Sequence, residues 1–92
     1  MNGAVRLRIE GRVQGVGYRA WLEDEARAQG LRGWVRNRRD GSVEALLIGP
    51  SAALMAVIGA CRQGPRLAAV TNVAATPDQD DGSTGFRTAP TA

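Results

Sequence analysis

The stretch "GRVQGVGYR", residues 11–19, joins a segment typical of a β-strand to a segment typical of an α-helix. Three of its nine residues are glycines and two are arginines. Glycine takes up backbone angles that turn successive N–H groups toward one point, and such a nest at the start of a helix binds anions. Glycine-rich turns are more often plain connections, so the rest of the chain has to decide between a turn and an anion site.

The residues on either side of this turn indicate what it connects. Before it, apolar residues alternate with charged ones, which predicts a half-buried strand over residues 4–13. After it, residues 18–29 contain no glycine or proline, and apolar side chains recur at four-residue spacing. This pattern predicts a helix, and Gly30 is placed to end it in a left-handed cap.

Three further strands and a short final one follow from the same signals. Apolar and β-branched residues predict strands over residues 31–38, 43–48 and 67–75. The sequence "RDGS" at residues 39–42 contains Asp-Gly, a strong signal for the turn of a hairpin. A short strand over residues 85–88 would close the chain.

The second helix completes the pattern. Gly49 and Pro50 break the preceding strand, Ser51 is expected to cap the helix, and "QGP" at residues 63–65 ends it. The order strand, helix, strand, strand, helix, strand predicts the α+β, ferredoxin-like βαββαβ sandwich. We expect an antiparallel sheet of four strands plus the short C-terminal strand, with two helices on one face and the other face partly open to water. A chain of 92 residues is expected to be one domain, residues 1–92.

The composition limits the chemistry of the chain. All 12 basic residues are arginines, the formal net charge is +3, and there is neither lysine nor histidine. A lysine Schiff base, histidine acid–base catalysis and histidine metal sites are therefore excluded. No apolar run approaches the roughly 20 residues of a membrane span, so we expect a cytoplasmic protein with no membrane partner. Any catalysis would rest on positioning and charge, with no metal and no cofactor.

Arg19 is the residue that makes an anion site plausible. It falls in the first turn of the expected helix, where its planar guanidinium could grip two oxygens of a phosphate held by the nest. Two familiar glycine motifs do not fit: a P-loop needs a lysine, and Ala20 stands where a dinucleotide fingerprint needs its third glycine. On spacing alone, a structural turn stays ahead of an anion site.

Two motifs in this order resemble those of the acylphosphatase family. "GRVQGVGYR" is similar to the phosphate-binding stretch of that family, and "GWVRNRRDGSVEALLIG", residues 33–49, is similar to its second pattern. A weaker similarity extends over nearly the whole chain. The resemblance implies the ferredoxin-like fold already expected, and hydrolysis of small acyl phosphates to a carboxylate and inorganic phosphate.

The resemblance also implies roles for single residues. Arg19 matches the arginine that binds the phosphoryl group, and Asn37 matches the asparagine that orients the attacking water. The backbone N–H groups expected to complete the phosphate cradle are those of Gly15, Val16, Gly17, Tyr18 and Arg19. Other members carry bulkier residues where this chain has Gly17, so we expect a looser cradle here.

The first hypothesis is an enzyme that acts as a monomer on a small acyl phosphate, and two other functions stay open. A non-catalytic domain that binds phosphate or acyl phosphate would share both motifs. The arginines at residues 36, 38 and 39 favour an RNA-binding module on the same fold, but only 4% of the chain is aromatic. Such modules stack bases on aromatic side chains, so we expect no nucleic-acid partner.

Other conspicuous residues are expected to be structural. Trp34 and Cys61 are interpreted as packing residues. The acidic loop around residues 78–81 lacks the spacing of an EF-hand, so we expect it to be solvated.

Overall fold

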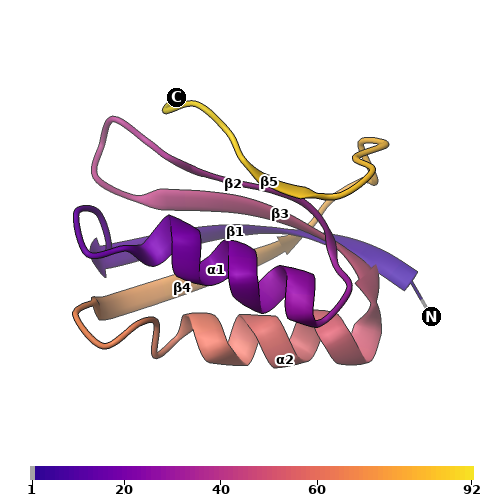
Figure 1. The fold of residues 1–92 in the computed structure, drawn as a ribbon, viewed down its shortest axis with the longest axis horizontal. Helices are drawn as coiled ribbons and strands as arrows, with labels where there is room; N and C mark the ends of the chain where they lie inside the picture. Colours follow the sequence, from indigo (N-terminus) through magenta and orange to yellow (C-terminus); the bar gives the residue numbers. More distant parts are fainter. Residues whose placement is uncertain (1) are drawn as a thin grey trace.

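Two helices cover one face of a five-stranded sheet (Figure 1). The computed structural model describes residues 2–92. Its elements are β1 (Asn2–Arg12), α1 (Tyr18–Ala28), β2 (Arg32–Asn37), β3 (Val43–Pro50), α2 (Ser51–Cys61), β4 (Ala69–Pro77) and β5 (Phe86–Thr88). The strand order is β4-β1-β3-β2-β5, with antiparallel neighbours except β5, which runs parallel to β2. The ferredoxin-like α+β fold is therefore confirmed, and the short C-terminal strand makes the sheet a mixed one.

The start of the second helix differs from the prediction. β3 continues through Gly49 to Pro50 instead of breaking before them. Pro50 occupies the N-cap position with extended angles, φ −63° and ψ 145°, and Ser51 is the first residue of α2. The prediction that Ser51 caps this helix was wrong, because the fixed φ of proline already gives the backbone geometry that an N-cap needs. The other helix ends as predicted, since Gly30 has a left-handed φ of 70°.

The main core lies between the two helices and the covered face of the sheet. Leu7 and Ile9 of β1 are fully buried in it, as their period-two spacing predicts. The buried residues contributed by the helices are Tyr18, Leu22, Ala26, Ala53, Leu54, Val57 and Cys61. This packing fixes where α1 starts above the sheet. Within residues 2–92, neither helix has the length and apolar character that crossing a membrane requires.

The other face of the sheet carries arginines above a small second core. Trp34 packs there on Leu46 and Ile48, and only 8% of it is exposed. The guanidinium groups of Arg6 and Arg36 lie 5.4 and 4.6 Å from the centroid of its ring. Trp34 is therefore a packing residue, as predicted, and its ring is covered where a nucleic-acid base would have to stack.

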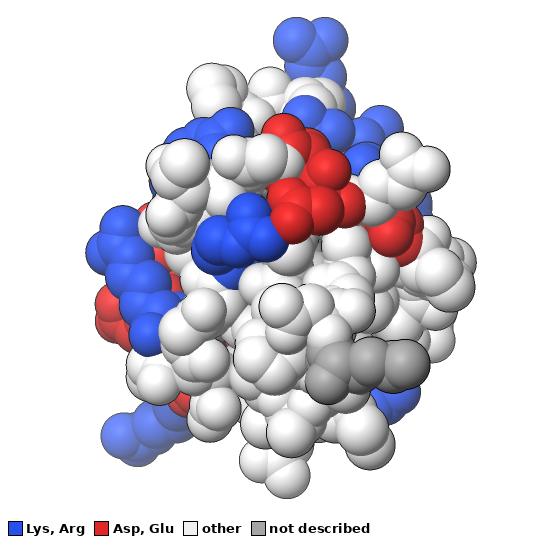
Figure 2. Space-filling model, turned by 90° about the vertical axis from the view of Figure 1, so that its right-hand side faces the viewer, with Lys and Arg blue, Asp and Glu red and all other residues white. Residues whose placement is uncertain are grey.

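The acidic loop is tied to the sheet, which the sequence did not predict. Asp78 accepts a hydrogen bond from Arg6 at 2.6 Å, and Asp81 accepts one from the indole N–H of Trp34 at 3.1 Å. Figure 2 shows carboxylates lying directly against arginines at this end of the molecule. The loop is solvated, as expected, since Asp80 and Asp81 are exposed, but its carboxylates also bond to strands that are far away in the sequence.

Glu44 holds several arginines of this second face together. One of its carboxylate oxygens accepts hydrogen bonds from Arg36 and Arg38, at 2.7 and 3.2 Å, and the other accepts one from Arg6 at 3.0 Å. Its side chain is 11% exposed. Burial alone would raise the pKa of Glu44, but the hydrogen bonds from Arg36, Arg6 and Arg38 outweigh it and hold that pKa below its usual value.

This network predicts how acid affects the Glu44→Gln variant. At pH 7 the substitution should lower the free energy of unfolding by about 1–2 kcal/mol, because the arginines lose their shared anion. A lowered pKa in the folded state stabilises the protein above the ordinary glutamate pKa of about 4.3, and this contribution is lost as pH falls through the folded value. The difference between wild type and variant should therefore shrink from pH 7 to pH 3 in urea titrations.

Asp24→Asn serves as the control, because Asp24 is exposed on α1. Its stability should follow the wild-type pH curve. A Glu44→Gln difference that is the same at pH 7 and pH 3 would contradict the electrostatic role of Glu44.

Candidate active site

The loop between β1 and α1 presents backbone N–H groups with no partner of their own. Gly15 and Gly17 have left-handed φ angles of 73° and 82°, and Gly17 is the N-cap of α1. Among residues 2–92, no backbone or side-chain oxygen accepts a hydrogen bond from the N–H groups of residues 15–19. Alternating left- and right-handed residues before a helix form an anion nest, and the first turn of a helix adds its own unpaired donors.

A cavity of about 280 Å³ opens beside this loop. Residues from four elements or loops line it: Val13, Gln14, Gly15, Gly17, Tyr18, Arg19, Ala20, Glu23, Asn37 and Thr88. The structure thus brings Arg19 and Asn37, 18 positions apart in the sequence, to one cavity. Of the residues predicted for the site, only Val16 is absent from the lining, and its partly buried side chain packs against the main core.

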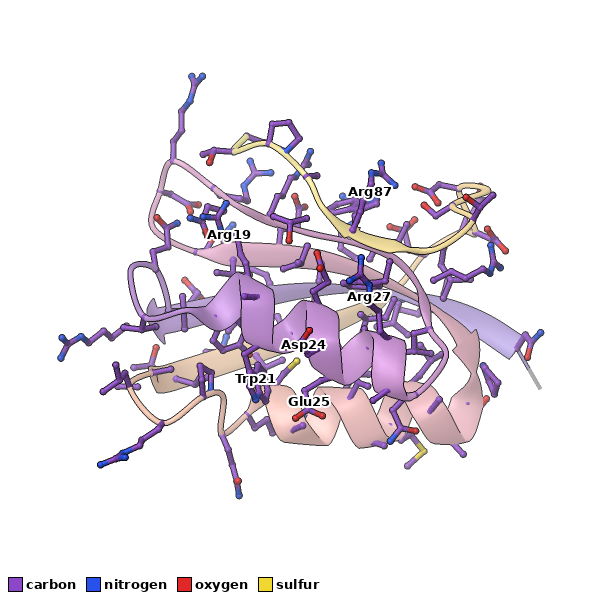
Figure 3. The ribbon with its side chains drawn as sticks, viewed as in Figure 1. Arg19, Trp21, Asp24, Glu25, Arg27 and Arg87 are labelled. Atoms are coloured by element: carbon purple, nitrogen blue, oxygen red, sulfur yellow. The ribbon has the colours of Figure 1, made fainter. Side chains whose placement is uncertain are left out.

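Arg19 is the cation of this cavity. It lies in the first turn of α1 and is half-buried. In Figure 3 it extends from the start of the helix on the side of the sheet, whereas Trp21 and Glu25 extend on the side of α2. Within the described residues, no carboxylate or carbonyl accepts a hydrogen bond from its guanidinium. Arg19 is therefore free to bind an anion held by the loop.

Asn37 is a neutral polar residue that lines the same cavity as Arg19. It is the last residue of β2, paired with Val43 of β3, and its carbonyl accepts a hydrogen bond from the N–H of Ala92 at 3.0 Å. Its carboxamide Oδ1 is buried, and no donor among residues 2–92 reaches it. Leaving a buried acceptor unpaired costs about 1–3 kcal/mol, which is a reason to expect a ligand with a hydrogen to donate there.

Glu23 and Thr88 line the cavity but were missed from the sequence. The hydroxyl of Thr88 donates a hydrogen bond to Glu23 at 2.8 Å, and Arg27 forms an ion pair with the same carboxylate at 3.0 Å. Glu23 lies one helical turn after Arg19, so its place could have been read from the spacing. The place of Thr88 could not, because it depends on β5 pairing with β2.

Tyr18 and Cys61 are structural in this site. The Tyr18 hydroxyl donates a hydrogen bond to the backbone carbonyl of Cys61 at 2.8 Å, which joins the first residue of α1 to the last residue of α2. Burial raises the pKa of Tyr18, and burial raises the pKa of the Cys61 thiol to about 11. Neither group is ionised near neutral pH, so neither supplies a nucleophile, and the prediction of Cys61 as a core residue is confirmed.

Comparison with known proteins decides the family. The acylphosphatase family model matches residues 5–88. The chain belongs to the acylphosphatase family. It is 52% identical to an acylphosphatase of Azorhizobium caulinodans over 99% of each chain.

Solved acylphosphatases have the same fold. One from Bacillus subtilis is 38% identical, covers 97% of this chain and 99% of its own, and superposes with a TM-score of 0.91. One from Coxiella burnetii is 30% identical, covers 96% of this chain and 93% of its own, and has a TM-score of 0.92. The chain is therefore an enzyme of a hydrolase family that acts on acyl phosphates, as the two motifs implied.

Gly17 of this acylphosphatase gives a prediction about the loop. A Cβ added at Gly17 or at the helical Gly59 would meet nothing within 4 Å, so the two positions differ in backbone angle and not in space. Gly17→Ala should destabilise the protein by about 1 kcal/mol, because alanine is strained at a left-handed φ. Gly59→Ala should stabilise it by about 0.5–1 kcal/mol, because alanine favours the helix.

Urea titrations of both variants test this prediction. Equal shifts of the two urea midpoints in the same direction would contradict the left-handed constraint at Gly17.

Proposed function

We propose that this acylphosphatase splits the carboxyl–phosphate bond of small acyl phosphates by in-line attack of a water molecule, without a metal ion. The observation that supports this is a single cavity lined by Arg19, Asn37 and the glycine loop. Among residues 2–92, neither the guanidinium of Arg19 nor the buried Oδ1 of Asn37 has a hydrogen-bond partner. These groups supply a phosphate-binding site and, in the same cavity, a hydrogen-bond acceptor for a water molecule. Acyl phosphates also require little acid–base chemistry.

The phosphoryl group is held by Arg19 and by the loop. The backbone N–H groups of Gly15, Val16, Gly17, Tyr18 and Arg19 donate to its oxygens. The guanidinium of Arg19 donates two parallel hydrogen bonds and adds a full positive charge. Phosphoryl transfer passes through a loose transition state with charge on the equatorial oxygens, so donors fixed in advance stabilise it without reorganising.

Asn37 orients the attacking water. Its Oδ1 accepts a hydrogen bond from the water and holds the water oxygen in line behind phosphorus. An amide has no useful basicity, so Asn37 cannot remove the proton, and its contribution is orientation. A glutamine orients the attacking water in the same way in some GTPases.

The leaving group explains why no acid is needed. A carboxylate is a weak base and departs without protonation, and the proton of the water passes to a phosphoryl oxygen of the substrate. This proton path uses no titrating side chain of the enzyme. It is consistent with a chain that has no histidine and no lysine.

We further propose that residues 1–92 act as one domain and as a monomer in the cytoplasm. Among residues 2–92 only two large hydrophobic side chains, Met55 and Leu67, are well exposed, far less apolar surface than a stable self-interface buries. Cys61 is buried as a free thiol, the form that a reducing compartment maintains. Sedimentation equilibrium should give the mass of one chain, and cell fractionation should recover the enzyme with cytoplasmic markers.

Alanine substitutions should separate the two catalytic roles. Arg19→Ala should lower kcat and raise KM, because it removes an interaction with bound and reacting phosphate. Asn37→Ala should lower kcat by about 10²–10³-fold, the usual cost of losing one preorganised polar contact, and should leave inhibition by inorganic phosphate nearly unchanged. Both are measured by hydrolysis of a simple aryl acyl phosphate.

Arg66→Ala is the matched control, because Arg66 is an exposed arginine on the loop before β4. Its kinetic constants should equal those of the wild type. Near-normal turnover by a folded Asn37→Ala protein would remove the water-orienting role.

The rate should depend neither on metal nor on a group that titrates near neutral pH. Among residues 2–92, Glu23 is the one carboxylate that lines the cavity, and it already pairs with Arg27 and accepts a hydrogen bond from Thr88. A chelator should therefore leave the initial rate unchanged, and kcat should show no inflection near pH 6.5, where a histidine would titrate. Loss of activity with chelator that added magnesium restores, or a break near pH 6.5, would contradict the mechanism.

A further inference from the structure

The two halves of the proposed site stand on strands that are not neighbours. The phosphate loop follows β1, and Asn37 ends β2, but the strand order β4-β1-β3-β2-β5 places β3 between them. The ladder of β1 with β3 ends at the pair Ile9 and Val43. Among residues 2–92, no ladder hydrogen bond beyond that pair holds the loop at a fixed distance from the hairpin of β2 and β3.

The side chain of Gln14 bridges this gap. Its carboxamide Nε2 donates to the backbone carbonyl of Arg38 at 2.8 Å and to that of Ser42 at 2.9 Å. These two carbonyls stand at the two ends of the hairpin turn, since the N–H of Arg38 also bonds to the carbonyl of Ser42. Both amide hydrogens of Gln14 are thereby used, and one of them reaches the residue next to Asn37.

No other side chain between residues 13 and 17 bonds to the turn at residues 38–42 in the part of the chain that the structure describes. Arg8 pairs with Asp40 of the same turn at 2.6 Å, but it lies on β1 and lines a different pocket, to which none of residues 13–17 contributes. Gln14, by contrast, is one of the residues that line the cavity of Arg19 and Asn37.

We propose that Gln14 is a positioning residue, which sets the distance between the water oriented by Asn37 and the phosphoryl group held by the loop. The inference rests on the proposed role of Asn37. In-line attack requires the water oxygen and phosphorus to meet at a fixed distance and direction, and a misplacement of about 1 Å can lower a rate by about 100-fold. Phosphate binding needs only the loop and Arg19, which lie on Gln14's own side of the gap.

Gln14→Met tests the inference, because methionine keeps the length of the side chain and removes both donors. We expect kcat to fall by about 10–100-fold, with the inhibition constant of inorganic phosphate within about threefold of wild type. In the Asn37→Ala background, Gln14→Met should lower kcat by less than about threefold, because the effects of two substitutions are not additive when one residue acts through the other. Gln14→Glu, which presents a carboxylate to the two carbonyls, should lower kcat at least as much.

Arg8→Ala is the control, since it removes a bond to the same turn from outside the loop, and it should change kcat by less than about twofold. Urea midpoints identify variants that fail to fold, and Gln14→Glu replaces Gln14→Met if only Gln14→Met fails to fold.

The inference is overturned if a folded Gln14 variant keeps wild-type kcat, if the loss of kcat is the same with and without Asn37, or if phosphate inhibition weakens in parallel with kcat. It is also overturned if Arg8→Ala lowers kcat equally. If the single variant Asn37→Ala keeps wild-type turnover, the proposed role of Asn37 is wrong, and the inference about Gln14 is wrong with it. If Asn37→Ala loses turnover but the Gln14 variants do not, only the inference about Gln14 is wrong.

Discussion

The left-handed backbone at Gly15 and Gly17 is the constraint on which the site depends. It turns the chain sharply from β1 into α1, and it directs the N–H groups of residues 15–19 away from internal acceptors. Because Gly17 is the N-cap, the same turn fixes where the helix begins and hence places Arg19 in its first turn. Glycine tolerates these angles without strain, so a cation and a set of dipoles converge on one cavity at little conformational cost.

The start of α1 is also fixed from outside the loop. Tyr18, its first residue, is buried and bonded to the backbone of Cys61 at the end of α2. A Cβ at Gly64 would come within 2.8 Å of the Tyr18 ring, so the chain after α2 can pass there only as glycine. Trp21 packs edge-to-face on the same ring, with the centroids 5.2 Å apart. The helix thus cannot slide along the sheet, and the direction of its N-terminal N–H groups is set by the core and not only by the loop.

The sequence predicts those parts of the fold and of the candidate site that depend on residues close together in the chain. The strand at Leu7 and Ile9, the helix after Tyr18 and the cap at Gly30 follow from periodicity and glycine positions, which are properties of neighbouring residues. Arg19 is a candidate from its place after the glycine-rich turn, but Asn37 is a candidate only through resemblance to a family, since neither spacing nor composition brings the two residues together. Their shared cavity depends on the strand order.

Most of the errors and omissions concern contacts between distant segments. Thr88 reaches Glu23 because β5 pairs with β2. The acidic loop bonds to arginines 48 and 72 positions earlier, Arg32 with Asp80 and Arg6 with Asp78. Gln14 bonds across the hairpin turn for the same reason. Ser51 is different: its predicted cap failed because the preceding proline fills that position, a local competition between two residues that both suit the start of a helix.

A neutral residue at position 37 fits the electrostatics of the cavity. In the proposed mechanism, the substrate brings a phosphoryl dianion, which the guanidinium of Arg19 and the loop dipoles attract. A carboxylate at residue 37 would accept a hydrogen bond from water equally well, but it would place like charge beside the phosphoryl oxygens in a partly desolvated site, where repulsion is poorly screened. The carboxamide oxygen avoids that repulsion. No donor among residues 2–92 reaches that oxygen, which costs free energy in the unbound enzyme; in the proposed mechanism, the attacking water removes that cost by donating a hydrogen bond to it.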